Sequence, residues 1–503
     1  MDIYNPATGE VATTIPRSSA EDVELAVSAA AAAASEWGAT TLAQRAALLQ
    51  RVADIVEQRT GTFAALETRD SGKPLKLSMN VDIPRAVANL RFFADFAATA
   101  QSASAYHPTD GVDGSGMAAV NLTQRSPLGV VSLVTPWNLP IYLLSWKVAP
   151  ALMCGNTVVA KPSEITPSTA SLLAEAFHEA GAPPGILNVV HGLGPEAAAP
   201  MVVHPEVKAI SFTGGTSTGR GVAQAAAGRF IKASLELGGK NAALVFADAI
   251  ATPEDIAATA RAVARSSFLN SGQICLCTSR ILVERASGAA GSDSYDAFLE
   301  ALVAETKELK VGDPLDASTD LGPLSSLEHR AKVQGYIDLA IREEGGEALC
   351  GGLGPRAGDQ SAAREAPEGG AGAFLDPTLI VGLPADSRTA TEEIFGPVAT
   401  IHPFSSEAEA VEVANATPYG LCSSVWTKDL ERAHRVGRCL DVGMVWVNTW
   451  LHRDLRTPFG GVKESGLGRE GGQYSLEFFS ETKNLCIALD GNRAVPPMPS
   501  KMK

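Results

Sequence analysis

The sequence has no apolar run approaching the roughly 20 residues that cross a membrane as a helix. Its first ten residues, MDIYNPATGE, contain neither a basic segment followed by an apolar one nor an arginine-rich transit pattern. Basic residues are in deficit, with 41 Lys and Arg against 56 Asp and Glu, and the formal net charge is -15. Because an acidic surface repels phosphates, this balance argues against a nucleic-acid or anionic-membrane partner. We expect a cytoplasmic protein.

Cysteine is scarce, with seven residues in 503, and no CxxC pair occurs. An odd, scattered set argues against a disulfide framework and favours a reducing compartment. Cys275 and Cys277 form a CxC pair in FLNSGQICLCTSR, but no cluster of His or Cys lies nearby to complete a zinc site. We therefore expect no bound metal, and ask instead whether either thiol is reactive.

The sequence does contain a long alternation of short apolar runs and helical segments. Ala- and Leu-rich stretches at 21–37, 42–70 and 82–101 have the apolar spacing of helices. From residue 128 onward, β-branched runs that stop at Gly or Pro alternate with helix-like segments. This order is typical of βα units, so it predicts parallel sheets covered by helices. The strand candidates are 129–136, 156–162, 186–192 and 207–215, followed after Gly272 by RILVER, TLIVG, VATIHPF and GMVWVN.

Glycines and a charged pair stand where predicted strands end. SFTGGTSTG (211–219) precedes a helix, so its backbone amides can approach a phosphate at the helix N-terminus. It is neither a GxGxxG fingerprint nor a P-loop, and a plain strand–helix turn explains it equally well. Lys161 and Glu164 lie just past another strand, where a ribose fits between them. A carboxylate there accepts both ribose hydroxyls and favours NAD over NADP, whereas the alternative is a solvated charged turn.

A carboxylate, a thiol and an amide are candidate catalytic groups. Glu236, in LELGGKN, lies between apolar residues and a Gly-Gly turn, where poor hydration makes a carboxylate a base near neutral pH. A surface Glu in a turn is the commoner case. Around Cys275, backbone amides and a following helix start would favour the thiolate. A thiolate that attacks a carbonyl needs donors for the oxyanion, and the Asn138 amide and the Cys275 N–H are candidates.

These segments together resemble the non-acylating, NAD-dependent aldehyde dehydrogenase superfamily over nearly the whole chain. The resemblance implies that Cys275 is the nucleophile, that Asn138 and the Cys275 amide form an oxyanion hole, and that Glu236 activates the hydrolytic water. It implies a thiohemiacetal, hydride transfer to NAD and hydrolysis of a thioester. The motifs, in the family's order, are NPATGE (5–10), PWNLP (136–140), KPSE (161–164), FTGGTSTG (212–219), LELGGKN (235–241), FLNSGQICLC (268–277), EEIFGPV (392–398) and PFGGVKESGLGRE (458–470).

The resemblance also implies an NAD site. Lys161 and Glu164 would hold the adenosine ribose, and Glu393 and Phe395 would hold the nicotinamide ribose and ring. Cys277 has no such role by pattern, so we expect it to pack, with transient pairing to Cys275 as the alternative. The other residues expected at the cofactor are Thr135, Pro136, Trp137, Ser163, Gly194, Phe212, Thr213, Gly214, Gly215, Thr216, Leu237 and Gly238.

The implied fold is α/β and has three parts. Residues 1–105 and 128–238 would form a Rossmann-like, parallel-sheet NAD-binding domain, and residues 239–464 an α/β catalytic domain. Residues 106–127 and 465–503 would form a small β oligomerisation element. The hairpin of this element would protrude, and a strand near its C-terminal end would join it across subunits, because an unpaired edge strand needs a partner. We expect a homodimer or homotetramer, and a surface loop at the aperiodic, Gly-rich residues 353–373.

The region 448–487 looks like the subfamily that oxidises 2-hydroxymuconic and 2-aminomuconic semialdehydes. These substrates carry a carboxylate at the end away from the aldehyde, and a guanidinium binds a carboxylate in bidentate fashion. The resemblance implies that Arg91 and Arg453 hold it, and His452 would add a polar contact. As alternatives, Arg453 belongs to a surface ion-pair network with Asp454, and Arg91 snorkels from a core helix.

Other functions remain open at this point. A different aldehyde, such as succinic semialdehyde or an aliphatic aldehyde, would use the same catalytic groups. A CoA-acylating enzyme needs no water-activating base, so Glu236 counts against it. A thiol esterase would not need the dinucleotide-type region with Glu164. A non-catalytic descendant would be expected to lose Cys275 or Glu236, and both are present.

Overall fold

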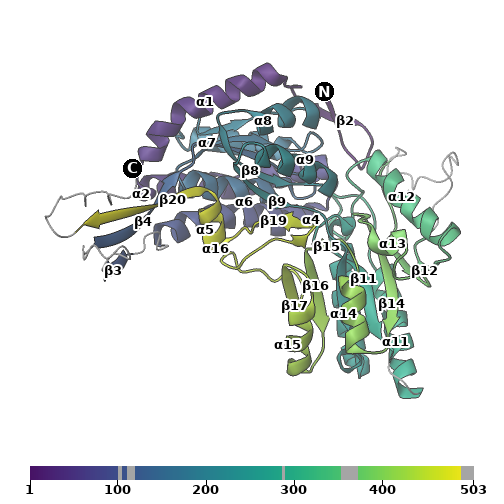
Figure 1. The fold of residues 1–503 in the computed structure, drawn as a ribbon. Coiled ribbons are helices and arrows are strands. Elements are labelled where there is room, and N and C mark those ends of the chain that lie inside the picture. The colour runs from purple at the N-terminus through teal and green to yellow at the C-terminus, as the bar shows by residue number, and fades with distance from the viewer. Residues whose placement is uncertain (100–104, 110–118, 286–288, 353–371, 489–503) are drawn as a thin grey trace.

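The computed structural model describes residues 1–99, 105–109, 119–285, 289–352 and 372–488. The described chain forms two α/β lobes, and a small sheet extends away from the first lobe (Figure 1). The predicted α/β class is therefore confirmed. The predicted loop at 353–373 lies almost wholly outside the described residues. Within them, no helix is both long and apolar enough to cross a membrane.

The sheet of the first lobe has the strand order β19-β9-β8-β5-β6-β7. β6 and β7 lie on one side of β5, and the later strands β8 and β9 lie on its other side, so the strand order reverses direction at β5. Ligands of such sheets bind outside the carboxyl ends of the strands at this point. Parallel strands are β5 (Val130–Val134), β6 (Thr157–Lys161), β7 (Leu187–Val189), β8 (Val207–Thr213) and β9 (Lys232–Glu236), and β19 (Gly466–Leu467) is antiparallel to β9.

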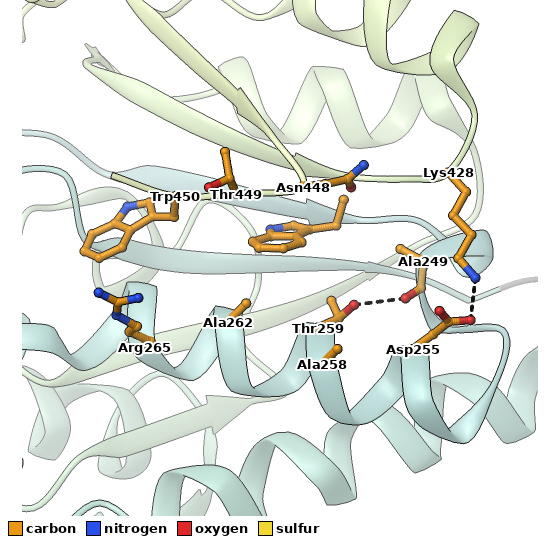
Figure 2. A pocket seen from close by; sticks show the side chains of 11 residues that line it. Ala249, Asp255, Ala258, Thr259, Ala262, Arg265, Lys428, Asn448, Thr449 and Trp450 are labelled. Carbon is orange, nitrogen blue, oxygen red and sulfur yellow. Dashed lines mark hydrogen bonds and ion pairs between the residues drawn. The ribbon is translucent and has the colours of Figure 1, made fainter. Parts of the chain in front are cut away.

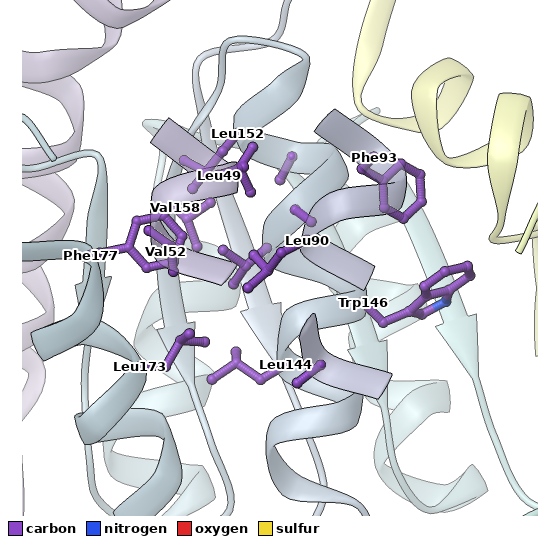
Figure 3. Close-up of a cluster of buried hydrophobic side chains, with 14 of the residues drawn as sticks. Leu49, Val52, Leu90, Phe93, Leu144, Trp146, Leu152, Val158, Leu173 and Phe177 are labelled. Atoms are coloured by element: carbon purple, nitrogen blue, oxygen red, sulfur yellow. The ribbon is translucent and has the colours of Figure 1, made fainter. Parts of the chain in front are cut away.

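Helices cover the first sheet, and their apolar faces form its core. Leu49, Val52, Leu90 and Trp146 are nearly or fully buried where helices meet the sheet (Figure 3). Burying such a side chain stabilises the fold by about 1.5–3 kcal/mol. The helix predicted at 42–70 is two helices that break at Arg59. The elements are α1 (Ala20–Ala39), α2 (Leu42–Gln58), α3 (Thr60–Ser71), α4 (Leu75–Leu77), the π-helical turn η1 (Ser78–Asp82), α5 (Ile83–Thr99), α6 (Pro140–Met153), α7 (Ser168–Glu179), the π-helical turn η2 (Gly194–Ala198), α8 (Ala199–Val203) and α9 (Thr216–Ala227).

The sheet of the second lobe has the order β12-β13-β14-β11-β10-β16-β17. Its central strands β10 and β16 were not predicted, because NAALV and CSSVW are rich in Ala and Ser, which have little strand preference. Its elements are β10 (Asn241–Val245), η3 (Ala247–Ile250), α10 (Pro253–Phe268), η4 (Leu269–Gly272), β11 (Thr278–Glu284), α11 (Ala289–Lys307), α12 (Leu327–Arg342), β12 (Glu347–Cys350), β13 (Thr378–Val381), α13 (Arg388–Thr391), β14 (Val398–Phe404), α14 (Glu407–Asn415), β16 (Cys422–Trp426), α15 (Leu430–Cys439) and β17 (Met444–Val447), with β15 (Tyr419–Gly420) paired to β18 (Val462–Lys463) beside it.

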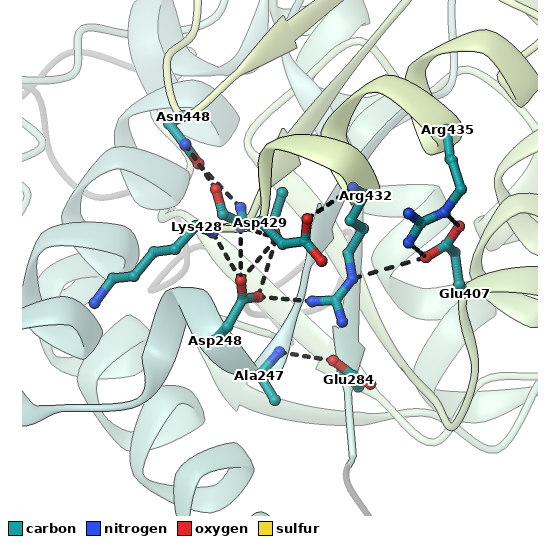
Figure 4. Close-up of polar contacts among 10 residues, drawn as sticks. Ala247, Asp248, Glu284, Glu407, Lys428, Asp429, Arg432, Arg435 and Asn448 are labelled. Atoms are coloured by element: carbon teal, nitrogen blue, oxygen red, sulfur yellow. Dashed lines mark hydrogen bonds and ion pairs between the residues drawn. The ribbon is translucent and has the colours of Figure 1, made fainter.

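One carboxylate fastens the turn after β10 to the turn after β16 (Figure 4). Asp248 accepts hydrogen bonds from the backbone N–H groups of Lys428, at 2.8 Å, and Asp429, at 3.1 Å. Thr427 Oγ1 and Arg432 Nη1 also donate to it, at 2.8 and 2.9 Å. These charge-assisted bonds join segments about 180 residues apart in the sequence, so they stabilise the contact between the two turns.

The small sheet consists, in the described chain, of β20 (Ser480–Ala488), β4 (Ala119–Pro127) and β3 (Ala105–Thr109). The prediction that the C-terminal strand joins the hairpin across subunits is wrong, because β20 pairs with β4 of its own chain. The predicted boundary at 465 also differs: β19 extends the first sheet, and α16 (Gly472–Phe478) packs on the first-lobe core through Leu476. At the other end of the chain, β1 (Asp2–Tyr4) pairs with β2 (Val11–Thr14).

Candidate active site

The residues predicted for the cofactor lie along the carboxyl edge of the first sheet. Each predicted segment begins where one of five parallel strands ends, and hydrogen bonds tie neighbouring ends together: Thr135 N donates to Lys161 O at 3.2 Å, and Gly214 N to Glu236 O at 3.1 Å. The segments are Thr135, Pro136 and Trp137 after β5; Lys161, Ser163 and Glu164 at β6; Gly194 after β7; Phe212 to Thr216 at β8; and Leu237 and Gly238 after β9.

This edge has the chemical features that a dinucleotide requires. Helix α9 begins directly after Gly215, and no side chain caps its N-terminal amides, which leaves them for a phosphate. The buried hydroxyls of Thr135 and Thr213 have no hydrogen-bond partner among the described residues. Lys161 Nζ lies 2.7 Å from Glu164 Oε2, and the Glu164 side chain is one-third exposed, as a ribose-binding carboxylate needs to be. Residues and geometry therefore fit NAD.

A second carboxylate and an aromatic ring stand where the two lobes meet. Gly239 N donates to Glu393 Oε1 at 2.9 Å, and a Cβ on Gly238 would displace the Glu393 carboxylate from this position. Burial raises the pKa of Glu393. The Phe395 backbone is left-handed, with φ of 62°, and its ring meets the Trp137 ring edge-on at 5.3 Å.

His329, which was not predicted, supports this strained position. Its Nε2 lies 2.7 Å from the Phe395 carbonyl oxygen, and its ring packs against Trp137 at 5.1 Å. Burial lowers the pKa of His329 to about 4, so the ring is neutral and its Nε2–H donates. A neutral donor at this carbonyl holds Phe395 in place, because left-handed backbone is costly for a residue with a side chain.

Cys275 follows a left-handed turn. Asn270, Ser271 and Gly272 have φ values of 54°, 54° and 69°, and they connect α10 to the cysteine. Ser271 Oγ donates to Gly322 O at 2.7 Å, and Asn241 Nδ2 donates to Cys275 O at 2.7 Å. Left-handed backbone costs about 1–2 kcal/mol per residue with a side chain, so these contacts hold the turn in a strained shape.

The surroundings of Cys275 do not favour its thiolate in this structure. Burial raises the pKa of the Cys275 thiol, and the charges of Glu236 and Glu393 raise it further, while Arg453 opposes them. The predicted helix start is absent as well, because β11, a strand, follows the cysteine. The part of the expectation that rests on a following helix start is therefore wrong, and burial with the two carboxylates favours the protonated thiol over the thiolate.

Cys277 is buried, and its Sγ lies 3.7 Å from Leu269 O. Burial raises the pKa of its thiol to about 12. Cys422 lies in the same apolar cluster, with its Sγ 3.7 Å from Leu276 O. A buried protonated thiol behaves as a small hydrophobe, which supports packing as the role of Cys277.

Asn138 lies in the connection from β5 to α6 and contacts the turn that precedes Cys275. Its side chain is buried, and Nδ2 donates to Gln273 O at 3.0 Å, which leaves the second N–H of the amide free. The Asn138 carbonyl accepts from Lys73 Nζ at 3.0 Å and from Asn270 Nδ2 at 3.2 Å. An oriented amide with one free N–H is the arrangement that an oxyanion donor needs.

Glu236 is the last residue of β9 and only 4% exposed. Its Oε1 has no hydrogen-bond partner among the described residues. Burial raises the pKa of Glu236 well above its ordinary range, and the charge of Glu470 raises it further, whereas Lys147 lowers it. Lys147 Nζ itself lies 2.6 Å from Glu470 Oε1. A carboxylate whose pKa is raised in this way is a stronger base than an exposed one, as a general base needs to be.

Two arginines meet beside these groups. The guanidinium carbon of Arg453 lies 3.9 Å from the Phe459 ring centroid and 5.3 Å from that of Trp146. Arg85, on α5, lies 5.5 Å from the same Trp146 ring and 4.8 Å from Tyr142. Burial, and less strongly the charge of Arg453, lowers the pKa of Arg85 to about 10. The Nη2 atom of each arginine is buried and has no hydrogen-bond partner among the described residues. The pair is therefore arranged to bind an anion.

Arg91 is not part of this pair, which contradicts its predicted role. It pairs with Asp54 at 2.8 Å and with Glu57 at 2.6 Å, both on α2, and its side chain is 36% exposed. Six residues on a helix separate Arg85 and Arg91 by about 240°, so the two point to different neighbours. Arg453 is likewise not in the alternative network, because Asp454 pairs with Arg456 instead.

A family comparison explains why these groups occur together. Residues 1–485 match the model of the aldehyde dehydrogenase family. The chain belongs to the aldehyde dehydrogenase family. This confirms the resemblance inferred from the eight motifs, and makes the enzyme an oxidoreductase acting on aldehydes.

Individual relatives of this aldehyde dehydrogenase match over nearly their full length. A 2-aminomuconic 6-semialdehyde dehydrogenase of a Pseudomonas species is 48% identical, over 96% of this chain and 94% of the relative. A 2-hydroxymuconic semialdehyde dehydrogenase of Pseudomonas sp. strain CF600 is 45% identical, over 96% and 95%. The solved structure of betaine aldehyde dehydrogenase from Staphylococcus aureus in complex with NAD+ has a TM-score of 0.88, 35% identity and coverage of 97% and 91%.

Several polar residues of the aldehyde dehydrogenase site were not predicted. Arg85 was not predicted, although it lies only six residues before Arg91 on the same helix, α5. The two arginines differ in the side of α5 from which they project, and the sequence does not show which side faces α6. Lys147 and Glu470 lie more than 300 residues apart in the sequence and meet as a buried pair. His452 is exposed. No local pattern marks the first three, because their partners are tertiary.

A cavity of about 490 Å³ lies between α10 and the segment after β17 of the aldehyde dehydrogenase (Figure 2). Trp450 and Arg265 face one another across it. Trp450 Nε1 donates to Leu276 O at 2.9 Å, so this wall contacts the residue that follows Cys275. None of the candidate catalytic groups lines this cavity.

Proposed function

We propose that this aldehyde dehydrogenase oxidises a semialdehyde of the 2-aminomuconic or 2-hydroxymuconic type, with NAD as the hydride acceptor. The observation that carries this proposal is the half-buried pair Arg85 and Arg453, each with a buried Nη2 that has no hydrogen-bond partner among the described residues. Buried guanidinium nitrogens without an acceptor are costly, and a substrate carboxylate placed between them removes that cost. The names of the 48% and 45% identical relatives support the same substrate class.

In the proposed reaction the Cys275 thiol gives its proton to a solvent water, and its sulfur attacks the aldehyde carbon to form a thiohemiacetal whose oxygen carries the negative charge. The Asn138 amide and the Cys275 backbone N–H stabilise the oxyanion. NAD, when bound, supplies the electrophilic ring that accepts the hydride. Glu236 then takes a proton from water, which attacks the thioester carbonyl; the sulfur leaves and the carboxylate product is released.

The proposed NAD site uses both lobes. The N-terminus of α9 receives a phosphate, Glu164 accepts the hydroxyls of one ribose, and Glu393 binds the other ribose beside Phe395. Glu164 carries a negative charge at the position where NADP has its 2′-phosphate, so this choice of residue favours NAD.

The function is tested with purified protein by following NADH absorbance for a panel of aldehydes. We expect kcat/KM for 2-hydroxymuconic semialdehyde to exceed that for hexanal by at least a hundredfold, because hexanal leaves both guanidiniums unpaired. Succinic semialdehyde, which is shorter, tests whether the carboxylate must reach a fixed distance from Cys275. Equal kcat/KM for the charged and uncharged aldehydes would contradict the proposed substrate class.

The proposal includes a homo-oligomer in the cytoplasm. β17 is an edge strand of the second sheet, and β20 is an edge of the small sheet with Leu485 and Ile487 each 44% exposed. Pairing of β20 from one copy with β17 of another satisfies both edges. Light scattering of an Ile487→Lys variant tests this pairing, which predicts a smaller assembly than the parent's. The free, exposed Cys439 and Cys486 suit a reducing compartment.

A further inference from the structure

Three ionisable side chains outside the reaction described above form a cluster without solvent contact. The side chains of Glu67, Lys73 and Asp82 are each 0% exposed. Lys73 Nζ lies 2.7 Å from Asp82 Oδ2 and 3.8 Å from Glu67 Oε1. Removing such ions from water costs several kcal/mol per ion, and a buried ion pair often fails to recover that cost. The cluster therefore calls for an explanation other than stability.

The cluster holds both ends of the segment that carries the oxyanion donor. Lys73 Nζ donates to the Asn138 carbonyl at 3.0 Å. At the other end, Glu67 Oε1 accepts from Ile141 N at 3.3 Å, in the first turn of α6, where no side chain of the helix's own caps the N–H groups. Thr169 Oγ1 donates to the second oxygen of Glu67 at 2.7 Å and fixes that carboxylate.

The Asn138 carbonyl also connects to the nucleophile. Asn270, in the left-handed turn before Cys275, donates Nδ2 to the same carbonyl oxygen at 3.2 Å. The carbonyl is thus the point where the buried ammonium, the strained turn and the oxyanion residue meet. A misplacement of about 1 Å at such a position is enough to cost about a hundredfold in rate.

We infer that Lys73, oriented by Asp82, is a positioning residue that sets the peptide of Asn138 so that its free amide N–H points at the oxyanion. Lys73 acts through Asn138 and contacts no reacting atom. The inference rests on the oxyanion role proposed for Asn138, so the experiment measures that role separately.

The test combines Lys73→Met and Asp82→Asn, each alone and together with Asn138→Ala, in the full-length enzyme. Lys73→Met is expected to lower kcat and kcat/KM about tenfold to a hundredfold, while the dissociation constant for NAD changes less than twofold. In the Asn138→Ala background, the same substitution is expected to cause no further loss, because the residue through which it acts is gone. Asp82→Asn keeps the side-chain shape. It is expected to lower kcat and kcat/KM by a smaller factor, and again to cause no further loss in the Asn138→Ala background.

A matched control is Lys76→Met, which removes a surface lysine of the neighbouring turn that pairs with Asp320 at 2.8 Å. This control is expected to leave all constants unchanged. Equal losses from Lys73→Met in both backgrounds would overturn the inference and leave the proposed function intact. Lower thermal stability with unchanged kcat in both cluster variants would also overturn it, since a purely structural role predicts that result. If Asn138→Ala by itself leaves kcat unchanged, the oxyanion role is the part that fails.

Discussion

Replacing Arg453 by Met is the most direct test of the proposal that Arg85 and Arg453 bind the substrate carboxylate. Met keeps most of the length and apolar packing of the Arg stem against Phe459 and Trp146, so the change measures the loss of charge and donors. Removing one partner of a buried, hydrogen-bonded charge pair costs about 2–4 kcal/mol. Because 1.4 kcal/mol is a factor of ten, kcat/KM for a muconic semialdehyde should fall about 30- to 700-fold.

The size of the effect should depend on the aldehyde and on the arginine. We expect kcat/KM for hexanal to stay within about threefold of the parent enzyme, because hexanal has no carboxylate. Arg85→Met should behave like Arg453→Met, and the double variant should lose less than the sum of the single losses, since both arginines bind one group. Arg91→Met, from the same helix as Arg85 but paired with α2, is the control and should leave both substrates unaffected.

The assay follows NADH absorbance over a range of each aldehyde at saturating NAD, with thermal stability measured in parallel. The reasoning is refuted if Arg453→Met lowers activity equally on hexanal and on the semialdehyde. It is refuted too if Arg91→Met lowers the semialdehyde rate as much as Arg85→Met does.

Four further outcomes are expected. Glu236→Gln should trap a thioester on Cys275, visible by intact-protein mass spectrometry. In the parent, deacylation should rise with pH as Glu236 ionises, and Glu470→Gln should move that rise to lower pH, because Glu470 raises the pKa of Glu236; an unmoved profile contradicts this. Glu164→Gln should raise KM for NAD and lower the ratio of kcat/KM for NAD to kcat/KM for NADP, measured with both cofactors. Asp248→Ala should lower the free energy of unfolding by about 1–3 kcal/mol in urea titrations, whereas Asp248→Asn should cost less.

Local sequence patterns were enough to predict much of the fold. β5 and β6 are buried on both faces, and their continuous β-branched runs show it. The helices α1 and α7 follow from apolar spacing, since an amphipathic helix encodes its buried face locally. The strands β10 and β16 were missed because tertiary burial, not strand preference, makes Ala- and Ser-rich segments extended.

The candidate catalytic residues could be selected from the sequence because each stands at a strand end or a glycine turn. Cys275, Glu236 and Asn138 occupy short motifs whose order along the chain identifies the family, and the structure brings their segments together at the junction of the two lobes. The chemistry of the cysteine was not accessible. Its thiol pKa depends on burial and on the charges of Glu236 and Glu393, and these come from distant parts of the chain.

The sequence by itself determined the α/β class, the family and the type of reaction, because these rest on local periodicity and on motifs in a fixed order. Only the tertiary structure decided which arginine joins Arg453. Arg85 and Arg91 share one helix and a similar local context, but they face different neighbouring helices. Arg85 therefore lies beside Arg453 over the Trp146 ring, whereas Arg91 forms a surface ion pair with Glu57. Contacts between distant segments decide such questions, since a charged side chain takes its role from the groups that packing places beside it.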